Sequence, residues 1–212
     1  MEQRTSLYLV CDTQTDWHKE KRIQGSCDVE LNEEGVNQAK LLCEVFSAFP
    51  IQAIYTSPKK RAHQAARILG KGLNVDLIVK QGLEEKSMGL AEGMGIEEFN
   101  IRYKKEIQQH YSLGYYERLF NKIVEDQESS IDLAERVLPA LHDICKKHPG
   151  KHVMVVTHEW ILKLLLILIG KYKEESIEIE NGSVLEMAGD GCRLDILTMQ
   201  GIKAEKGSVI QM

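Results

Sequence analysis

Short runs of hydrophobic residues recur along the chain and are apolar at nearly every position. Four of them are rich in Val, Ile and Tyr, at residues 7–10, 52–56, 75–79 and 153–157. A strand that is covered by helices on both faces is apolar throughout, whereas a strand with one wet face alternates apolar and polar residues. The four runs therefore predict strands of a mostly parallel sheet.

Helical patterns with readable starts lie between these strands. Asn32 can cap a helix whose first turn is acidic. Ser57 followed by Pro58 predicts the start of a second helix, and a third helix is expected over residues 131–147. Strands that alternate with helices imply right-handed crossovers, so the predicted fold class is an α/β domain with an open, mostly parallel sheet.

Residues 94–128 interrupt this alternation with a helical and aromatic segment. Open α/β sheets bind their ligands at the carboxyl ends of the strands, so a segment inserted there would cover the site. We see no repeat or Pro/Gly-rich linker that divides the chain. We therefore expect a single domain over residues 1–212 with a helical cap insertion at about residues 94–128.

The composition is that of an ordinary globular protein and limits the partners. The chain has 212 residues, a formal charge of −5 and 43% hydrophobic residues, which suffice for one well-filled domain. The mild acidity disfavours nucleic acid and anionic membranes, because both attract basic surfaces. The apolar stretch at residues 160–169 is about half as long as the roughly 20 residues that span a bilayer, so it predicts a buried helix.

The cysteines indicate the redox compartment. They are odd in number, widely spaced and without a CxxC pair: Cys11, Cys27, Cys43, Cys145 and Cys192. This pattern is typical of a reduced protein rather than of a disulfide scaffold or a structural zinc site. The first residues are too charged for a secretory signal, and we expect a cytoplasmic protein.

Polar groups follow the four predicted strands and form the candidate site. They are Cys11, Asp12 and Thr13 after the first run, Arg61 after the second, Glu85 after the third and His158 after the fourth. Parallel strands bring their carboxyl ends to one edge of a sheet, so these side chains are expected to meet. An Arg, a Glu and a His that converge there could bind an anion.

Seven short motifs, in order along the chain, carry a resemblance to a known family. They are "LVCDTQTDWH", "RIQGSCDVELNEEGVNQA", "SPKKRAHQAA", "LEEKSMGLAEG", "QESSIDLAERV", "VTHE" and "NGSV". The sequence resembles, over nearly its full length, the phosphoglycerate mutase-like branch of the histidine phosphatase superfamily. The resemblance implies a three-layer α/β/α fold.

The resemblance also implies roles for single residues. In that family one His is the nucleophile that becomes phosphorylated, two Arg residues help to hold the phosphate, a second His completes the pocket and a Glu protonates the leaving group. The resemblance assigns the second Arg to Arg61, the Glu to Glu85 and the second His to His158. It places His18 and Gln24 at further positions of the phosphate site.

The first motif departs from the family pattern at three adjacent positions. Cys11 stands in place of the first Arg, Asp12 in place of the nucleophilic His, and Thr13 in place of a Gly. The exchange makes the local formal charge more negative by about two units, which repels phosphate. Unit charges about 4 Å apart interact by roughly 4 kcal/mol in a partly exposed cleft. We therefore predict a pseudophosphatase in which Asp12 pairs with Arg61 and which acts by binding a ligand or a protein.

An active enzyme is the alternative to this prediction. It would be a phosphomonoesterase or a phosphoglycerate mutase-like enzyme in which Asp12 attacks phosphorus and forms an aspartyl phosphate. A residual site of Arg61, Glu85 and His158 could also hydrolyse or transfer phosphate. An anionic nucleophile needs a metal or several Arg groups to screen it from a phosphate dianion.

Two further hypotheses concern the same part of the chain. The carboxylates and imidazoles of Asp12, Glu85, His158 and His18 would suit a divalent metal, although we expect no cofactor. Cys11 could serve as a thiol nucleophile, but no Arg follows it at the spacing of the CX5R phosphatase loop, and a neighbouring carboxylate disfavours the thiolate.

The expected partners follow from the same observations. A phosphorylated small molecule or a protein is the expected partner, with no nucleic acid and no membrane. The resemblance also implies a homodimer as a possible partner state, because members of the family often form dimers.

Overall fold

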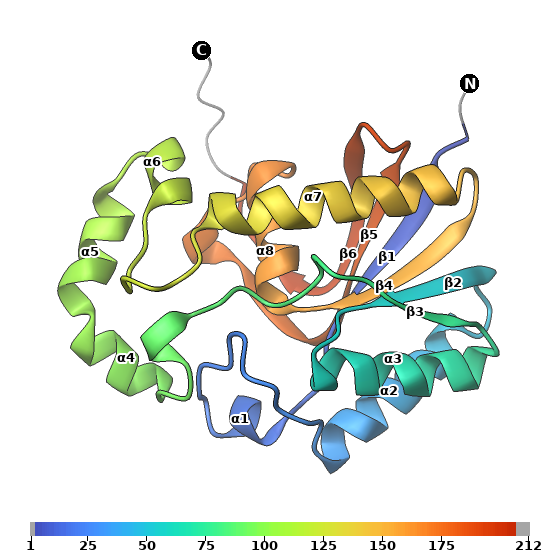
Figure 1. Ribbon diagram of the computed structural model, residues 1–212, viewed down its shortest axis with the longest axis horizontal. Helices are drawn as coiled ribbons and strands as arrows, with labels where there is room; N and C mark the ends of the chain where they lie inside the picture. Colours follow the sequence, from blue (N-terminus) through green and yellow to red (C-terminus); the bar gives the residue numbers. More distant parts are fainter. Residues whose placement is uncertain (1–2, 207–212) are drawn as a thin grey trace.

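The computed structural model describes residues 3–206 and shows a central sheet with helices on both faces (Figure 1). Its strands are β1 (Thr5–Cys11), β2 (Ile51–Thr56), β3 (Leu77–Val79), β4 (His152–Thr157), β5 (Glu178–Gly189) and β6 (Leu194–Lys203). Its helices are α1 (Asp16–Lys19), α2 (Glu33–Phe46), α3 (Lys60–Leu73), α4 (Ile96–Arg102), α5 (Lys104–Ser112), α6 (Tyr115–Phe120), α7 (Ser130–Lys147) and α8 (Glu159–Leu168).

The sheet confirms the predicted α/β fold class and adds an edge that was not predicted. Its strand order is β3-β2-β4-β1-β5-β6. The four strands predicted from apolar runs pair in parallel, whereas β5 lies antiparallel to β1 and β6 lies antiparallel to β5. β6 was not predicted because most of its residues are only partly buried or exposed, so it has no continuous apolar run.

The two faces of the sheet are covered by different helices. α7 and α8 cover one face, where Leu9 and Val155 pack in one core cluster with Leu141 of α7. α2 and α3 cover the other face, where Val10 packs in a second cluster with Ala62 of α3. Successive residues of a strand point to opposite faces, so strands buried on both sides must be apolar at every position.

The predicted helix starts are confirmed at two places and wrong at one. Asn32 caps α2 and its side chain accepts the backbone N–H of Gly35 at 2.9 Å. α7 begins at Ser130, one residue before the predicted range. The start predicted at Ser57 is wrong because α3 begins at Lys60, and the hydroxyl of Ser57 is used elsewhere.

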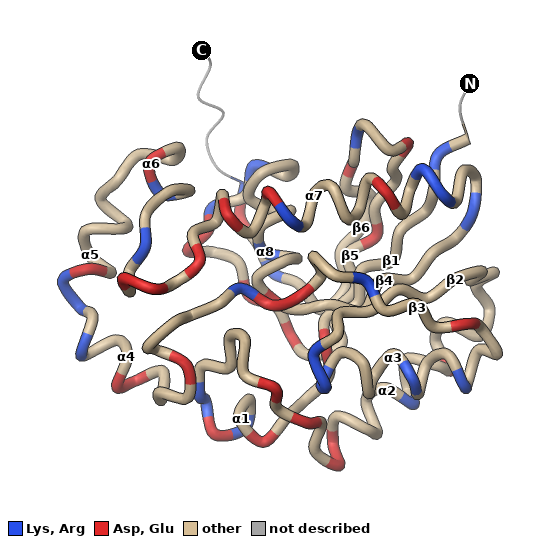
Figure 2. Tube along the Cα trace, in the orientation of Figure 1, with Lys and Arg blue, Asp and Glu red and all other residues tan. Residues whose placement is uncertain are grey.

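The apolar stretch at residues 160–169 forms most of α8, whose inner residues pack in the core. Within residues 3–206, no helix combines the length and the apolar character needed to cross a membrane. Acidic and basic residues are interspersed along most of the chain (Figure 2).

The segment predicted as a cap holds α4, α5 and α6, which lie together to one side of the sheet (Figure 1). Met94, Phe99 and Val124 form a small core of this segment, and the ring of Trp160 from α8 packs against it. This contact places the helical segment beside the beginning of α8, which follows β4 directly.

Candidate active site

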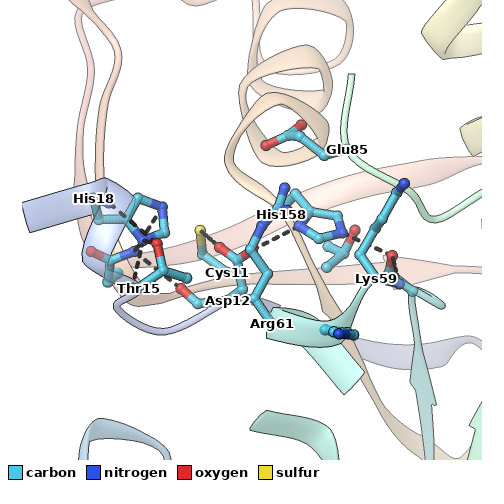
Figure 3. Close-up of polar contacts among 12 residues, drawn as sticks. Cys11, Asp12, Thr15, His18, Lys59, Arg61, Glu85 and His158 are labelled. Carbon is cyan, nitrogen blue, oxygen red and sulfur yellow. Dashed lines mark hydrogen bonds and ion pairs between the residues drawn. The ribbon is translucent and has the colours of Figure 1, made fainter. Parts of the chain in front are cut away.

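The predicted site residues meet at the carboxyl edge of the parallel strands (Figure 3). Asp12 directly follows β1, Ser57 directly follows β2 and His158 directly follows β4. β4 pairs in parallel with both β1 and β2, so the three strands end side by side. The sheet register therefore brings together side chains that are more than 40 residues apart in the sequence.

Asp12 is the centre of the site and is held in its charged form. Its Oδ2 accepts hydrogen bonds from Arg61 Nε at 2.5 Å and from His158 Nδ1 at 2.7 Å. All three residues are at most 2% exposed. Burial alone would raise the pKa of Asp12, but the charge of Arg61 and the His158 contact outweigh it and hold the pKa well below its usual range. Asp12 is a carboxylate, and its predicted pairing with Arg61 is confirmed.

This carboxylate decides the tautomer of His158. An ionised carboxylate only accepts hydrogen bonds, so the ring proton of His158 lies on Nδ1. Nε2 then has the free lone pair and accepts the hydroxyl of Ser57, whose Oγ lies 2.8 Å away. Burial, with Arg61 nearby, lowers the pKa of His158 to about 4, so the ring is neutral at pH 7. Because both ring nitrogens are engaged, His158 has no free lone pair with which to attack phosphorus.

Arg61 also anchors the loop before α2. Its Nη1 donates to the carbonyl of Cys27 at 2.9 Å and its Nη2 to the carbonyl of Gly25 at 3.1 Å. A guanidinium has five N–H groups, and three of them serve Asp12 and this loop. Within residues 3–206, the remaining two make no hydrogen bond.

Two further predicted residues, Thr13 and Gln24, hold polar atoms without a partner. Thr13 Oγ1 and Gln24 Oε1 are buried, and within the described part of the chain neither makes a hydrogen bond. Buried polar atoms are costly when unsatisfied. The site therefore retains polar groups that a bound ligand or water would satisfy.

Glu85 has the opposite protonation state from Asp12. It is buried, and its Oε1 accepts the backbone N–H of Lys86 at 2.8 Å. Burial raises its pKa to about 8 against the opposing charge of Arg61, so Glu85 carries a proton at pH 7. Figure 3 shows its carboxyl apart from the bonded pair of Asp12 and His158.

Cys11 and His18 lie in the neighbourhood but serve other contacts. The Cys11 Sγ lies 3.7 Å from Asp12 Oδ1, and burial together with Asp12 raises the pKa of the thiol well above its usual value. The hypothesis of a Cys11 thiolate nucleophile is therefore wrong. His18 Nδ1 accepts the backbone N–H of Thr15 at 3.1 Å and closes the capping box of α1.

The described residues do not support the hypothesis of a metal site. Among residues 3–206, no group of three or more His, Cys, Asp and Glu side chains is arranged to hold a metal ion. Asp12 and His158 bind each other through the atoms that a metal would need.

Two contributors to the site were assigned no chemical role from the sequence. Ser57 stands among the polar groups after the second predicted strand and in the motif "SPKKRAHQAA", but only a helix start was predicted for it. Asn181, in the motif "NGSV", donates from Nδ2 to the backbone carbonyl of Asp12 at 3.3 Å. The same carbonyl accepts the backbone N–H of Gly182 at 3.2 Å. These two contacts position Asp12 from β5.

Comparison with known proteins agrees with this arrangement. A family model described as histidine phosphatase superfamily (branch 1) matches residues 7–200. The chain is 30% identical over 162 residues to the uncharacterized phosphatase PhoE of Bacillus subtilis (strain 168), across 76% of each protein. It is 32% identical over 168 residues to the metal-independent phosphoserine phosphatase of Arabidopsis thaliana, across 78% of this chain and 68% of that protein.

A solved structure shows the same fold. Phosphoglycerate mutase from Bacillus anthracis str. Sterne superposes with a TM-score of 0.82 at 20% identity, over 94% of each chain. This match confirms the three-layer arrangement that the resemblance implied.

These relatives overturn the prediction of a pseudophosphatase. They are named as phosphatases, and at 30% and 32% identity they cover most of this chain. The prediction rested on the charge change at Asp12, and it counted neither the protonated state of Glu85 nor a nearby lysine, Lys86. A protonated Glu85 does not add to the negative charge of Asp12, and the positive charge of Lys86 opposes it.

Proposed function

This chain belongs to the histidine phosphatase superfamily (branch 1), and we propose that it is a phosphomonoesterase in which Asp12 attacks the phosphate. The observation that carries the proposal is the opposite protonation of two buried carboxyls, ionised Asp12 and protonated Glu85. Environments that push two pKa values apart provide an acid and a nucleophile at one pH. Transfer of the phosphate to a second acceptor instead of water would be the mutase form of the same chemistry.

The first step uses the free oxygen of Asp12. Oδ2 is occupied by Arg61 and His158, whereas Oδ1 has only the weak contact with the Cys11 thiol. A bond forms between Oδ1 and phosphorus while the ester bond of the substrate breaks, and the departing oxygen takes the proton of Glu85. The products of this step are an alcohol and an aspartyl phosphate.

The second step restores the site. Glu85, now a carboxylate, accepts a proton from water while the water oxygen attacks the aspartyl phosphate. Phosphate leaves, Asp12 returns as a carboxylate and Glu85 is protonated again.

Positive charge must offset the repulsion between Asp12 and the phosphate dianion. Arg61 keeps two unused N–H groups beside Asp12. The buried Lys86 directly follows Glu85 in the chain and adds a second cation near the leaving group.

Turnover of a chromogenic aryl phosphate, phosphoserine and 3-phosphoglycerate tests the proposal. We expect hydrolysis by the unaltered protein, loss of it in Asp12→Ala, and a decrease of about 10²-fold to 10⁴-fold in Glu85→Gln. Glu97→Gln, an exposed carboxyl on α4, is the control and should keep full activity. An unaltered protein that hydrolyses none of these esters would overturn the proposal, and so would an Asp12→Ala protein with undiminished turnover.

The location and the partner belong to the same proposal. We propose a cytoplasmic protein, supported by its five free cysteines, which a reducing compartment would preserve. Its proposed partner is a phosphorylated small molecule.

A further inference from the structure

A cavity of about 190 Å³ lies between the helical segment and the start of α8. Its walls include Lys86, Trp160 and Lys163, together with His110 and Glu174. Two of these residues continue directly from the proposed site, because Lys86 follows Glu85 and Trp160 comes two residues after His158. The cavity thus adjoins the residue that would protonate the leaving group.

The cavity contains two ammonium groups that form no ion pair within the described residues. The Nζ of Lys86 lies 4.2 Å from the centre of the Trp160 ring, and the Nζ of Lys163 lies 4.8 Å from it. Lys86 is only 4% exposed. Over residues 3–206, neither Nζ takes part in an ion pair or a side-chain hydrogen bond. An aromatic face attracts a cation, but it leaves the three N–H donors of each ammonium without acceptors.

The other charged groups in the cavity do not cancel these two. Glu174 is the one carboxylate in the wall, and its Oε2 lies 3.4 Å from His110 Nε2. Glu85 is protonated at pH 7, and Glu128, which also faces Lys86, is paired with Arg136 at 2.7 Å. Glu174 faces both ammonium groups and Glu159 faces Lys163, but among residues 3–206 neither carboxylate forms an ion pair with either lysine.

The burial of the Lys86 ammonium indicates that this group has a binding role. A lysine is rarely buried unless it is paired, and its burial lowers the pKa of Lys86 to about 8. The amine still carries a proton at pH 7. An anion bound beside it would satisfy the N–H donors that the protein leaves free.

We infer that this cavity binds a second anionic group of the substrate, a carboxylate or a second phosphate, through Lys86 and Lys163. The inference rests on the proposed function, because it identifies the substrate class of the same site. It assigns Lys86 and Lys163 as specificity-determining residues and makes the substrate a small phosphomonoester with an acidic leaving group. The cavity is smaller than the roughly 300–1,000 Å³ of pockets for drug-sized ligands, so the group it takes is compact.

Calorimetric binding of phosphonates, which cannot be hydrolysed, tests the inference without any need for turnover. Propylphosphonate has no second anion, 3-phosphonopropionate has a carboxylate and propane-1,3-diphosphonate has a second phosphonate. We expect at least one doubly anionic ligand to bind about tenfold more tightly than propylphosphonate. The comparison of the two doubly anionic ligands identifies which group the cavity takes.

Variants then assign the effect to the two lysines. Lys86→Met keeps an unbranched chain against Trp160 and should remove most of the tenfold preference for the doubly anionic ligand over propylphosphonate, with both ligands measured on the same variant. Lys163→Met should remove part of it, and this half-buried position still tests the inference if the Lys86 variant does not fold. Lys105→Met, on the exposed side of α5, removes the same charge and should leave the preference intact.

The outcomes separate this inference from the proposed function. Equal binding of the three phosphonates, or an undiminished preference in both lysine variants, overturns the inference even if the aryl phosphate is hydrolysed. A lysine-dependent preference in a protein that hydrolyses no ester supports the cavity and overturns only the proposed function.

Discussion

The strand edge around Asp12 and the cavity around Lys86 differ in how their buried charges are paired. Asp12 is matched by Arg61 and by His158, and the ring of His158 is matched again by Ser57. Lys86 is nearly as buried, yet its ammonium lies over the ring of Trp160 and forms no ion pair within residues 3–206. A matched network holds its atoms in one geometry, which suits a group that must react. An ammonium that forms no ion pair keeps its N–H donors free, which suits a group that must bind a ligand.

Removal of Asp12 is the change with the largest expected effect on stability. Asp12→Ala leaves the buried guanidinium of Arg61 without its counter-ion, which should lower the free energy of unfolding by about 3–5 kcal/mol. Lys86→Met removes a charge that has no partner, so it should change that free energy by less than about 1 kcal/mol. Urea unfolding of both variants measures the difference. A Lys86 variant that loses as much stability as the Asp12 variant would show that Lys86 has a partner and would break the comparison.

The protonated state of Glu85 predicts the pH dependence. Its pKa is raised from 4.5 to about 8, so kcat/KM should fall above about pH 8 as the acid loses its proton. The folded state also binds this proton more tightly than the unfolded state does. The contribution of Glu85 to stability is therefore complete below pH 4.5 and is lost as the pH rises through about 8.

A pH series of turnover and of urea unfolding checks both effects. Glu85→Gln should abolish the alkaline fall in turnover and flatten the stability profile over the same interval. If the unaltered protein keeps a constant kcat/KM to about pH 10, then Glu85 does not act as the acid.

Ser57 should have the smallest of the three effects, because it acts through His158. Ser57→Ala leaves the buried Nε2 of His158 without its hydrogen bond, which costs about 1–3 kcal/mol of stability. We expect kcat to fall about tenfold with little change in KM, since the ring loses one of its two contacts. Ser57→Thr keeps a hydroxyl and should restore most of the rate.

The size of the Ser57 effect also tests the nucleophile. Hydroxylamine releases phosphate from an aspartyl phosphate, so a hydroxylamine-labile phosphoprotein in rapidly quenched reactions would support attack by Asp12. A Ser57→Ala protein as inactive as Asp12→Ala, with a hydroxylamine-stable phosphoprotein, would instead assign the attack to Ser57.

Local sequence signals account for much of the fold and for the membership of the site. Four mostly apolar runs were sufficient to predict β1 to β4, including β3, which lies at an edge of the sheet and is partly exposed. β5 and β6 escaped the prediction because their edge of the sheet is partly exposed. The residues Arg61, Glu85 and His158 were found by their places after predicted strands and by the family motifs.

The electrostatics of the site could not be predicted in the same way. Counting formal charges at Asp12 suggested a pocket that repels phosphate and led to the wrong prediction of a pseudophosphatase. The count covered only the exchanged residues and took no account of Glu85, which burial keeps protonated. It also passed over Lys86, whose neighbour Trp160 lies more than 70 residues away in the sequence.

By itself, the sequence determined the α/β fold class, the positions of the parallel strands and the residues that meet at their carboxyl ends. Apolar periodicity and motif order depend only on which residues follow one another along the chain. The tertiary structure alone decided the charges at the site: Asp12 is ionised beside Arg61, Glu85 is protonated by burial, and the ammonium of Lys86 lies over Trp160. The physical reason is that a protonation state depends on burial and on charges a few ångströms away, and both are set by segments that are distant in the sequence.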